Sequence, residues 1–454
     1  DTALMKNPSY FALSAQQARW SLVCALLASA TAGVAAQPTM PAGVGSNPQL
    51  PPPHEAILIP TVNIAPAKGW PKGELPKAPA GFRVTAFATD LDHPRWVYTL
   101  PNGDVLVAES NKPEPEPGTK DVMAQGLRGK AMGIVQKRAG AGVPSANRIT
   151  LLRDADGDGV AETRSVFITD LVSPYGMALV GDQLYIANAN GIVKVTYETG
   201  QTSNTSAKTK VTDLPAGANH HWTKNILASA DGSKLFATVG SNSNIGDNGM
   251  AAEQGRAAIW EVDVATGNKR LFSTGLRNPN GMGWEPQSKA LWTVVNERDE
   301  LGNDLVPDYL TSVKDGAFYG WPWSYWGQNV DKRVKPANPE MVAKAIAPDY
   351  GLGSHVAPLG MAFSDASMPA PYASGAFVGQ HGSWNRKELA GYNVVFVPFA
   401  NGQPSGPPVE FLGGFLTPEG NAYGRPVGVA LDGKGALLVA DDVGNAIWRV
   451  GRAK

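Results

Sequence analysis

Short runs of alternating apolar and polar residues, separated by turn-forming residues, occupy most of the chain from residue 81 onward. Six segments repeat one arrangement: a turn, an apolar run, a turn mostly rich in Gly, Asp or Asn, and a second apolar run. This arrangement predicts a β-hairpin in each segment. The six segments begin at Pro94, Pro174, Lys224, Pro279, Pro358 and Pro426.

The spacing of the hairpins indicates one repeated unit. Successive copies start about 50 to 80 residues apart, which leaves room for four strands and their loops. Apolar runs at 258–263 and 393–399 fit outer strands. A unit repeated at this period predicts a β-propeller, and six copies predict an all-β, six-bladed β-propeller. A two-sheet sandwich would also contain many strands, but it would not repeat this hairpin.

The first 80 residues have a different composition and do not show this repeat. Residues 20–36 are apolar and rich in Ala, Ser and Thr, follow Lys6 and Arg19, and end in Val-Ala-Ala. This predicts a secretory signal peptide at 1–36, because the stretch is short for a membrane-spanning helix. Residues 37–80 are rich in proline and predict an extended N-terminal arm, with a possible strand at 57–64. The six-bladed domain is expected at 81–454.

The composition limits the classes of partner. The chain has 39 Lys and Arg against 40 Asp and Glu, a formal net charge of −1. This balance favours neither nucleic acid nor an anionic membrane surface as a partner. The single cysteine, Cys24, lies in the predicted signal peptide, so the mature chain would contain no disulfide. We expect a periplasmic or secreted protein that is not an integral membrane protein.

Polar residues directly follow the second apolar run of each repeat. In a propeller, loops that leave the inner strands converge on one mouth of the central channel, so these residues should line a polar pocket on the axis. The clusters are Glu109–Ser110, Asn188–Asn190, Ser241–Asn242, Asn296–Asp299, His381–Ser383 and Asp441–Asp442.

Two of only six histidines, His220 and His221, stand side by side in the segment 219–225. Adjacent residues of an extended segment point to opposite sides, so we expect one histidine to face a cavity and the other to face the scaffold. Imidazole is the usual proton acceptor near neutral pH. The alternative is a histidine pair that only caps a loop.

Arginines and carboxylates occur together in the later repeats. Arg277, Arg386 and Arg425 are expected near one mouth, which suits a polyanionic ligand held by bidentate contacts. The loop 296–304 adds carboxylates and backbone carbonyls, which suit a hard cation.

These residues lie in blocks that resemble the soluble quinoprotein sugar dehydrogenases, the glucose/sorbosone dehydrogenase family, over residues 80–450. The blocks are HHWTKNILASADG, GLRNPNGM, VVNERDELGNDLVPDYL, GAFYGWPWSYWG, HVAPLGMAF, HGSWNR and GRPVGVALDG. The third and fourth blocks look most like the sorbosone dehydrogenase branch. The chain has Glu-Arg-Asp at 297–299, where the glucose enzymes have a Gly-Pro-like calcium loop.

The resemblance implies a propeller that holds pyrroloquinoline quinone (PQQ) and Ca²⁺ at its mouth. It implies an oxidoreductase that oxidises a sugar or sugar aldehyde, aldose or sorbosone-like, by hydride transfer to PQQ. Electrons would leave to a separate acceptor such as a cytochrome or a quinone, because the sequence has no CxxCH haem motif. The implied residues are His221 as general base with Arg277 as catalytic partner; Asn278, His355, Arg386 and Arg425 at the cofactor; and Glu297, Arg298 and Asp299 at Ca²⁺, through backbone carbonyls.

A separate motif, Asp154-Ala-Asp156-Gly-Asp158-Gly, resembles the first half of a calcium-binding loop. A full EF-hand loop requires Glu at its twelfth position, where this chain has Ser165. The motif predicts either a structural Ca²⁺ site or an Asp-rich hairpin turn.

Two other functions fit a propeller with a polar mouth. One is a lactonase or other hydrolase that uses metal-bound water, and the other is a non-catalytic carbohydrate-binding propeller. The arginines argue against the hydrolase. The presence of both His221 and Arg277 argues against a binding module that has lost its cofactor and its catalytic activity.

Overall fold

The structure is a computed structural model, and it describes residues 40–54, 61–114, 119, 129 and 133–453. The predicted signal peptide therefore lies outside the described residues. Of the possible strand at 57–64, residues 61–64 are described, and they are not in a strand.

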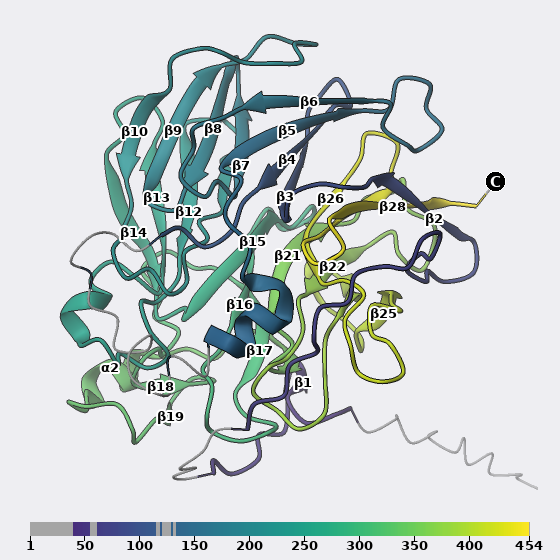
Figure 1. Cartoon of the computed structure of the whole chain (residues 1–454). Helices are drawn as coiled ribbons and strands as arrows, with labels where there is room; N and C mark the ends of the chain where they lie inside the picture. Colours follow the sequence, from purple (N-terminus) through teal and green to yellow (C-terminus); the bar gives the residue numbers. More distant parts are fainter. Residues whose placement is uncertain (1–39, 55–60, 115–118, 120–128, 130–132, 454) are drawn as a thin grey trace, which may run out of the picture. The chain divides into compact units, whose positions relative to one another are not determined.

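Six antiparallel sheets, here called blades 1 to 6, follow one another along the chain and form a six-bladed propeller (Figure 1). The first strand of each blade is the innermost, since β26 packs on β3, β21 on β26 and β15 on β21. Blades 1 to 3 comprise β3 (Pro94–Thr99), β4 (Val105–Glu109), β5 (Arg148–Arg153) and β6 (Thr163–Ile168); β7 (Met177–Val180), β8 (Gln183–Asn188), β9 (Gly191–Thr196) and β10 (Thr209–Asp213); and β11 (Ile226–Ala228), β12 (Lys234–Val239), β13 (Ala258–Asp263) and β14 (Lys269–Thr274).

Blades 4 and 5 carry additional short strands. In blade 4, β1 (Val44–Gly45) from the N-terminal arm pairs with the outermost strand, β20. The strands of these blades are β15 (Asn278–Trp284), β16 (Leu291–Asn296), β17 (Pro307–Ser312) and β20 (Tyr350–Ser354); and β21 (Pro358–Phe363), β22 (Gly375–Gln380), β23 (Asn393–Ala400), β24 (Gln403–Pro404) and β25 (Val409–Leu412). The connection from β17 to β20 holds the hairpin β18 (Ser324–Tyr325) and β19 (Asn329–Val330) and the helix α2 (Pro339–Lys344).

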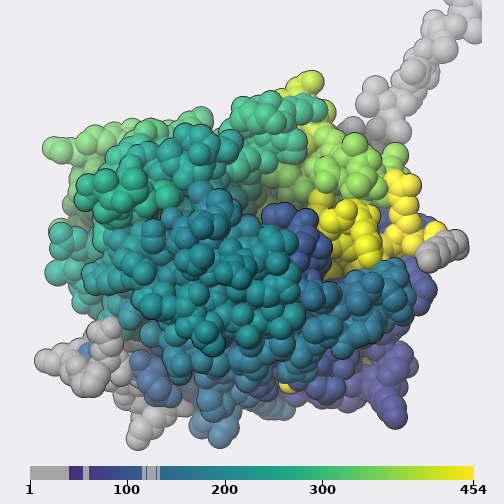
Figure 2. Space-filling view, turned by 90° about the horizontal axis from the view of Figure 1, so that it is seen from above, coloured from purple at the N-terminus to yellow at the C-terminus, as the bar shows by residue number. Residues whose placement is uncertain are grey.

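Blade 6 joins the two ends of the propeller. It contains β26 (Pro426–Leu431), β27 (Leu437–Asp441), β28 (Ala446–Arg452) and, from the start of the domain, β2 (Phe82–Ala88). The register of the closing pair sets Phe82 opposite Arg452. In Figure 2 the yellow of this blade lies between the blue of blade 1 and the green of blade 5. The ring is thus closed by backbone hydrogen bonds between its first and last strands.

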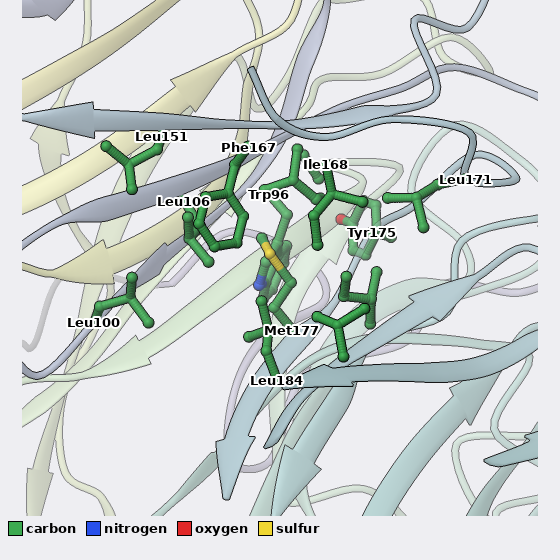
Figure 3. Packing of buried hydrophobic residues seen from close by; sticks show 14 of the residues in the cluster. Trp96, Leu100, Leu106, Leu151, Phe167, Ile168, Leu171, Tyr175, Met177 and Leu184 are labelled. Atoms are coloured by element: carbon green, nitrogen blue, oxygen red, sulfur yellow. The ribbon is translucent and has the colours of Figure 1, made fainter. Parts of the chain in front are cut away.

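Apolar side chains fill the spaces between neighbouring blades. Between blades 1 and 2, Trp96 and Leu106 meet Tyr175, Met177 and Leu184, and all five are buried (Figure 3). Burial of each such side chain contributes roughly 1.5–3 kcal/mol. These layers hold the inner strands at fixed positions around the axis, which confirms the six-bladed propeller predicted from the repeats.

The N-terminal arm runs back over the blades. Ala67 and Lys77 form isolated bridges with Ala422 and Gly413, and the Trp70 indole donates to Asp441 Oδ2 at 2.7 Å. Within the part of the chain that the structure describes, no helix is long and apolar enough to cross a membrane.

Candidate functional site

A cavity of about 360 Å³ opens among the loops that precede the innermost strands and follow the second strands of the blades. Residues from five of the six blades line it, together with Ile64 of the N-terminal arm and residues 135–141 of the connection from β4 to β5. That connection includes the π-helix η2 (Lys137–Ala141; part of the blue helix in Figure 1). The polar and charged lining residues are His93, Arg95, Asn111, Lys112, Gln136, His220, His221, Asn244, Arg277, Asn278, Asn296, Glu297, Asp299, Glu300, Asp308, His355, His381, Arg425 and Asp442.

His221 reaches the cavity from the loop before β11. Its Nδ1 lies 2.9 Å from the carbonyl oxygen of Ser241 and 3.0 Å from the Ser241 hydroxyl. A carbonyl only accepts, so Nδ1 carries the proton and Nε2 keeps its lone pair. Burial first, and then the charge of Arg277, lower the pKa of His221 well below its ordinary value. The ring is therefore a neutral imidazole with a fixed tautomer.

His220 also lines the cavity, so the expectation that one histidine faces the scaffold is wrong. The reason is that residues 220 and 221 form a bend and not an extended strand, which begins only at Ile226. Asn219, at φ 39°, precedes the bend, and its side chain bonds to Ala189 O and accepts from Lys224. The two imidazole rings pack edge to face with centroids 4.9 Å apart.

Arg277 forms the centre of a buried network. Its guanidinium donates to Asp299 Oδ2 and Asn244 Oδ1 at 3.0 Å each, and to the Glu297 carbonyl at 2.7 Å. His355 joins from blade 4, with Nδ1 3.3 Å from Asp299 Oδ1. Burial opposes a charge on His355, but the hydrogen bond and charge of Asp299 raise its pKa overall. Asp299 thus sits between two cationic groups.

Asn278, which follows Arg277, starts the inner strand β15 and lines the cavity. Its Oδ1 is buried and has no hydrogen-bond partner among the described residues. A Cβ at Gly240 would lie 2.4 Å from that oxygen and 2.5 Å from the His221 Cβ. Only glycine lets these two side chains approach the strand so closely.

The three residues expected at Ca²⁺ are placed differently from one another. Glu297 and Asp299 line the cavity, whereas Arg298 turns inward and donates to the carbonyls of Pro322 and Ser324. The Glu297 carbonyl already accepts from Arg277, and the Asp299 carbonyl accepts from Arg333 at 3.0 Å. The carboxylates of these two residues also have partners, since Glu297 Oε2 accepts from Arg298 and the Asp299 carboxylate contacts Arg277 and His355.

Of the two later arginines, only Arg425 lines the cavity. Its guanidinium donates to the carbonyls of His381 and Ala65, at 3.1 and 2.9 Å, and its Nε is buried without a partner among the described residues. Arg386 instead donates to the Ser354 carbonyl and to Asp304, both at 3.2 Å. The N-terminal arm, through Ala65, thus helps to hold a cavity arginine.

Sequence reasoning placed His381 and Asp442 in the axial pocket, but it did not predict the charged cluster that forms around Asp442. Its Oδ2 contacts His381 Nε2 at 2.8 Å, His93 Nε2 at 3.5 Å and the guanidinium of Arg95. It also missed Asp308, whose pKa burial raises to about 7, although its carboxylate accepts from the backbone N–H groups of 297 and 357.

One pattern in the sequence predicts some of the residues that line the cavity. In four of the six repeats the residue directly before the proline that heads the inner strand lines the cavity. The four residues are His93, Asn278, Ala357 and Arg425.

The Asp-rich motif lies elsewhere, in the turn between β5 and β6. Carboxylate oxygens of Asp154, Asp156, Asp158 and Glu162 lie within 4.8 Å of one another, a spacing that suits a metal ion. None of the four lines the axial cavity. Glu162 thus joins the three aspartates that the motif singles out.

Fold and cavity together define a six-bladed propeller protein whose axial site combines a neutral histidine, buried arginines and buried carboxylates. The sequence matches the family described as TrAA12-like over residues 139–310 and 329–453. Since this is more than half of the chain, the protein belongs to that family.

Individual relatives agree with this assignment. The aldose sugar dehydrogenase YliI of Escherichia coli K12 is 33% identical over 135 residues, 29% of this chain and 32% of that protein. The chain spans less than two thirds of the length of the first curated relatives it matches. Two solved structures share the fold at 20% identity: a calcium structure of a Trichoderma reesei family AA12 enzyme (TM-score 0.66, 87% of this chain and 99% of that one) and the holo PQQ domain of Coprinopsis cinerea pyranose dehydrogenase (TM-score 0.65, 86% and 100%).

Proposed function

We propose that this protein is a PQQ- and Ca²⁺-dependent dehydrogenase that oxidises a sugar or sugar aldehyde, of the aldose or sorbosone type. It would act in the periplasm or outside the cell and pass electrons to a separate acceptor. The observation that carries the proposal is that His221 and the buried Arg277 lie in one cavity, where His221 is a neutral ring whose Nε2 keeps its lone pair.

The residues present fit both groups. PQQ is a quinone with three carboxylates, and the cavity offers the guanidinium groups of Arg95, Arg277 and Arg425. The Nε atoms of Arg95 and Arg425 are buried and have no hydrogen-bond partner among the described residues. Asn278 Oδ1, buried without a partner among the described residues, is another group that a bound ligand would satisfy. A Ca²⁺ ion would bind oxygen atoms of Glu297, Asp299 or Asp308, since hard cations prefer oxygen ligands.

His221 would act as the general base. Its Nε2 accepts the proton of a substrate hydroxyl, and Ser241 holds the ring so that this nitrogen is the one without a proton. The low pKa keeps the ring neutral through physiological pH. PQQ, when bound, supplies a two-electron acceptor for the hydride.

Asp299 pairs with the guanidinium of Arg277, and the bonds of Arg277 to Asn244 and Glu297 fix its direction. A guanidinium fixed in advance stabilises negative charge without reorganisation during the reaction. Burial of the network also keeps water away from it.

Dye-linked turnover tests the proposal. Purified protein supplied with PQQ and Ca²⁺ should reduce an artificial electron acceptor when given one or more members of an aldose and sugar-aldehyde panel. The same protein without PQQ is the control and should be inactive. Turnover that does not depend on PQQ, or hydrolysis of a lactone panel in its place, would contradict the proposal.

A further inference from the structure

Apart from Arg95, the residues clustered around Asp442 have no role in the chemistry described above. The members of this cluster come from blade 1 (His93 and Arg95), from the end of β22 in blade 5 (His381) and from the end of β27 in blade 6 (Asp442). Blades follow one another around the ring, so blade 6 stands opposite blade 3, whose first strand follows His221. A ligand that fills the cavity would therefore meet both histidine sites.

Asp442 fixes the tautomer of His381. A carboxylate accepts and does not donate, so the nitrogen 2.8 Å from it, Nε2, carries the proton when the ring is neutral. Burial alone would raise the pKa of Asp442, but His381, His93 and Arg95 hold it well below its usual range. The carboxylate is thus ionised, and Nδ1 of His381 keeps its lone pair.

His381 is open toward the cavity. Its side chain is 24% exposed, whereas that of Asp442 is 1% exposed. Its Nδ1 forms no hydrogen bond with another residue in the described part of the chain. Burial lowers the pKa of His381 despite the charge of Asp442, and Arg425 and Arg95 lower it further. The ring thus presents a hydrogen-bond acceptor, and not a cation, to whatever occupies the cavity.

We propose that His381 is a specificity-determining residue that accepts a hydrogen bond from a hydroxyl of the bound sugar, and that Asp442 holds the ring in position for this contact. This inference rests on the proposed function. It concerns a contact to a hydroxyl other than the one whose proton His221 removes.

The chemistry selects a hydroxyl over a carboxylate of the cofactor. A carboxylate of a cofactor has no proton to donate, so it cannot bond to an unprotonated nitrogen. A sugar offers several hydroxyl donors. Asp442 Oδ1 is buried without a partner among the described residues and lines the same cavity, so a polyhydroxylated ligand would supply a donor for it as well.

Two substitutions of His381 test the roles of its two ring nitrogens separately. His381→Gln keeps an amide donor at the position that contacts Asp442 but removes Nδ1. His381→Asn, the matched control, keeps a polar atom at the position of Nδ1 and gives up the contact with Asp442. Both are polar and smaller than or similar in size to histidine. The probes are D-glucose and its monodeoxy analogues, with PQQ affinity measured by titration for each protein.

A hydrogen bond between neutral partners predicts that His381→Gln raises KM for glucose about 3- to 10-fold. The asparagine variant should be affected less, and PQQ affinity should stay within about twofold in both. For one deoxy analogue, which lacks the contacted hydroxyl, the glutamine variant and the wild type should have the same KM.

Four results would overturn the inference. A loss of PQQ affinity with unchanged KM would make His381 a cofactor contact. Equal effects on glucose and on every deoxy analogue would exclude a contact with one hydroxyl. If the wild type shows no turnover, glucose binding is measured by saturation-transfer NMR and is compared between the proteins in place of KM. A wild type that binds no sugar overturns the inference together with the proposed function. A wild type that turns over glucose, beside variants that match it, overturns this inference alone.

Discussion

At the scale of single residues, the site depends on which nitrogen of each imidazole carries a proton. His221 and His381 are both neutral rings with one nitrogen committed to a fixed oxygen, a backbone carbonyl in one case and a carboxylate in the other. His355 differs, because it contacts Asp299 through Nδ1 and the Gly302 carbonyl through Nε2. Its two nitrogens both face acceptors, which suits an imidazolium.

Replacement of His221 tests its role as the base. Proton removal by a positioned base is worth roughly 10²–10⁴-fold in rate, so His221→Ala should lower dye-linked kcat by about that factor. PQQ affinity should change by only a few-fold, since it rests on other residues. His221→Asn is the matched control: it can still donate to Ser241 from the δ position, and it should lose as much activity.

His220→Ala should have a smaller effect than His221→Ala. Although both rings line the cavity, the contacts of Nδ1 with Ser241 fix the tautomer of His221 that a base requires. If the His220 variant is inactive while the His221 variant keeps its turnover, the assignment of the base must be reversed.

The stability of the protein at acid pH provides a separate test at His93. Burial lowers the pKa of this histidine from 6.5 to about 4, so the unfolded chain binds a proton in this range that the folded protein excludes. The free energy of unfolding should therefore fall as the pH drops from 6.5 to 4, by about 3 kcal/mol from this group. Urea denaturation at pH 7 and pH 4.5 measures the change.

His93→Asn should reduce that loss. Asparagine is the suitable replacement because His93 has φ 54°, a left-handed conformation that asparagine tolerates. A variant that loses as much stability as the wild type between the two pH values would show that other groups cause the acid sensitivity.

At the scale of elements, the strands were predictable and the connections were not. Each hairpin is a local pattern of apolar runs and turn residues, so blades 1 to 6 follow from the sequence. The contact of Arg425 with the Ala65 carbonyl joins residues 360 positions apart, and no local pattern encodes it. The bend at His220 was missed for the same reason: Asn219 is held by Ala189, Lys224 and Arg256, which only the folded chain brings together.

The turn between β5 and β6 should bind Ca²⁺ and stabilise blade 1 without affecting catalysis. The gathered oxygens of Asp154, Asp156, Asp158 and Glu162 motivate this prediction. Asp156→Ala should lower the melting temperature in Ca²⁺ buffer but not in EDTA, because a ligand stabilises only the state it binds. Asp182→Ala, in the exposed turn between β7 and β8, is the control.

In calcium buffer, dye-linked kcat of the Asp156 variant should equal that of the wild type. A large loss of turnover at an unchanged melting temperature would place this turn in the catalytic machinery and contradict the prediction.

At the scale of the whole molecule, the propeller brings groups from five blades to one cavity, although they are spread over more than 300 residues. The sequence pattern predicted the ring and, through the resemblance, placed His221, Arg277, Asn278, His355 and Arg425 at its mouth, where the structure gathers them. It could not predict that Arg298 and Arg386 point elsewhere. The direction of a side chain depends on its neighbours in space, such as the carbonyls of Pro322, Ser324 and Ser354.

The most direct test of the account is a calorimetric titration of the protein with PQQ, in Ca²⁺ buffer and in EDTA. The arginines and carboxylates of the cavity predict saturable binding of PQQ at one site in Ca²⁺ buffer and much weaker binding in EDTA. The variant Arg425→Gln should also bind PQQ more weakly than the wild type, because one of the cationic groups for the carboxylates of PQQ is lost. Absence of binding in both buffers would contradict the central claim that this propeller is a quinoprotein.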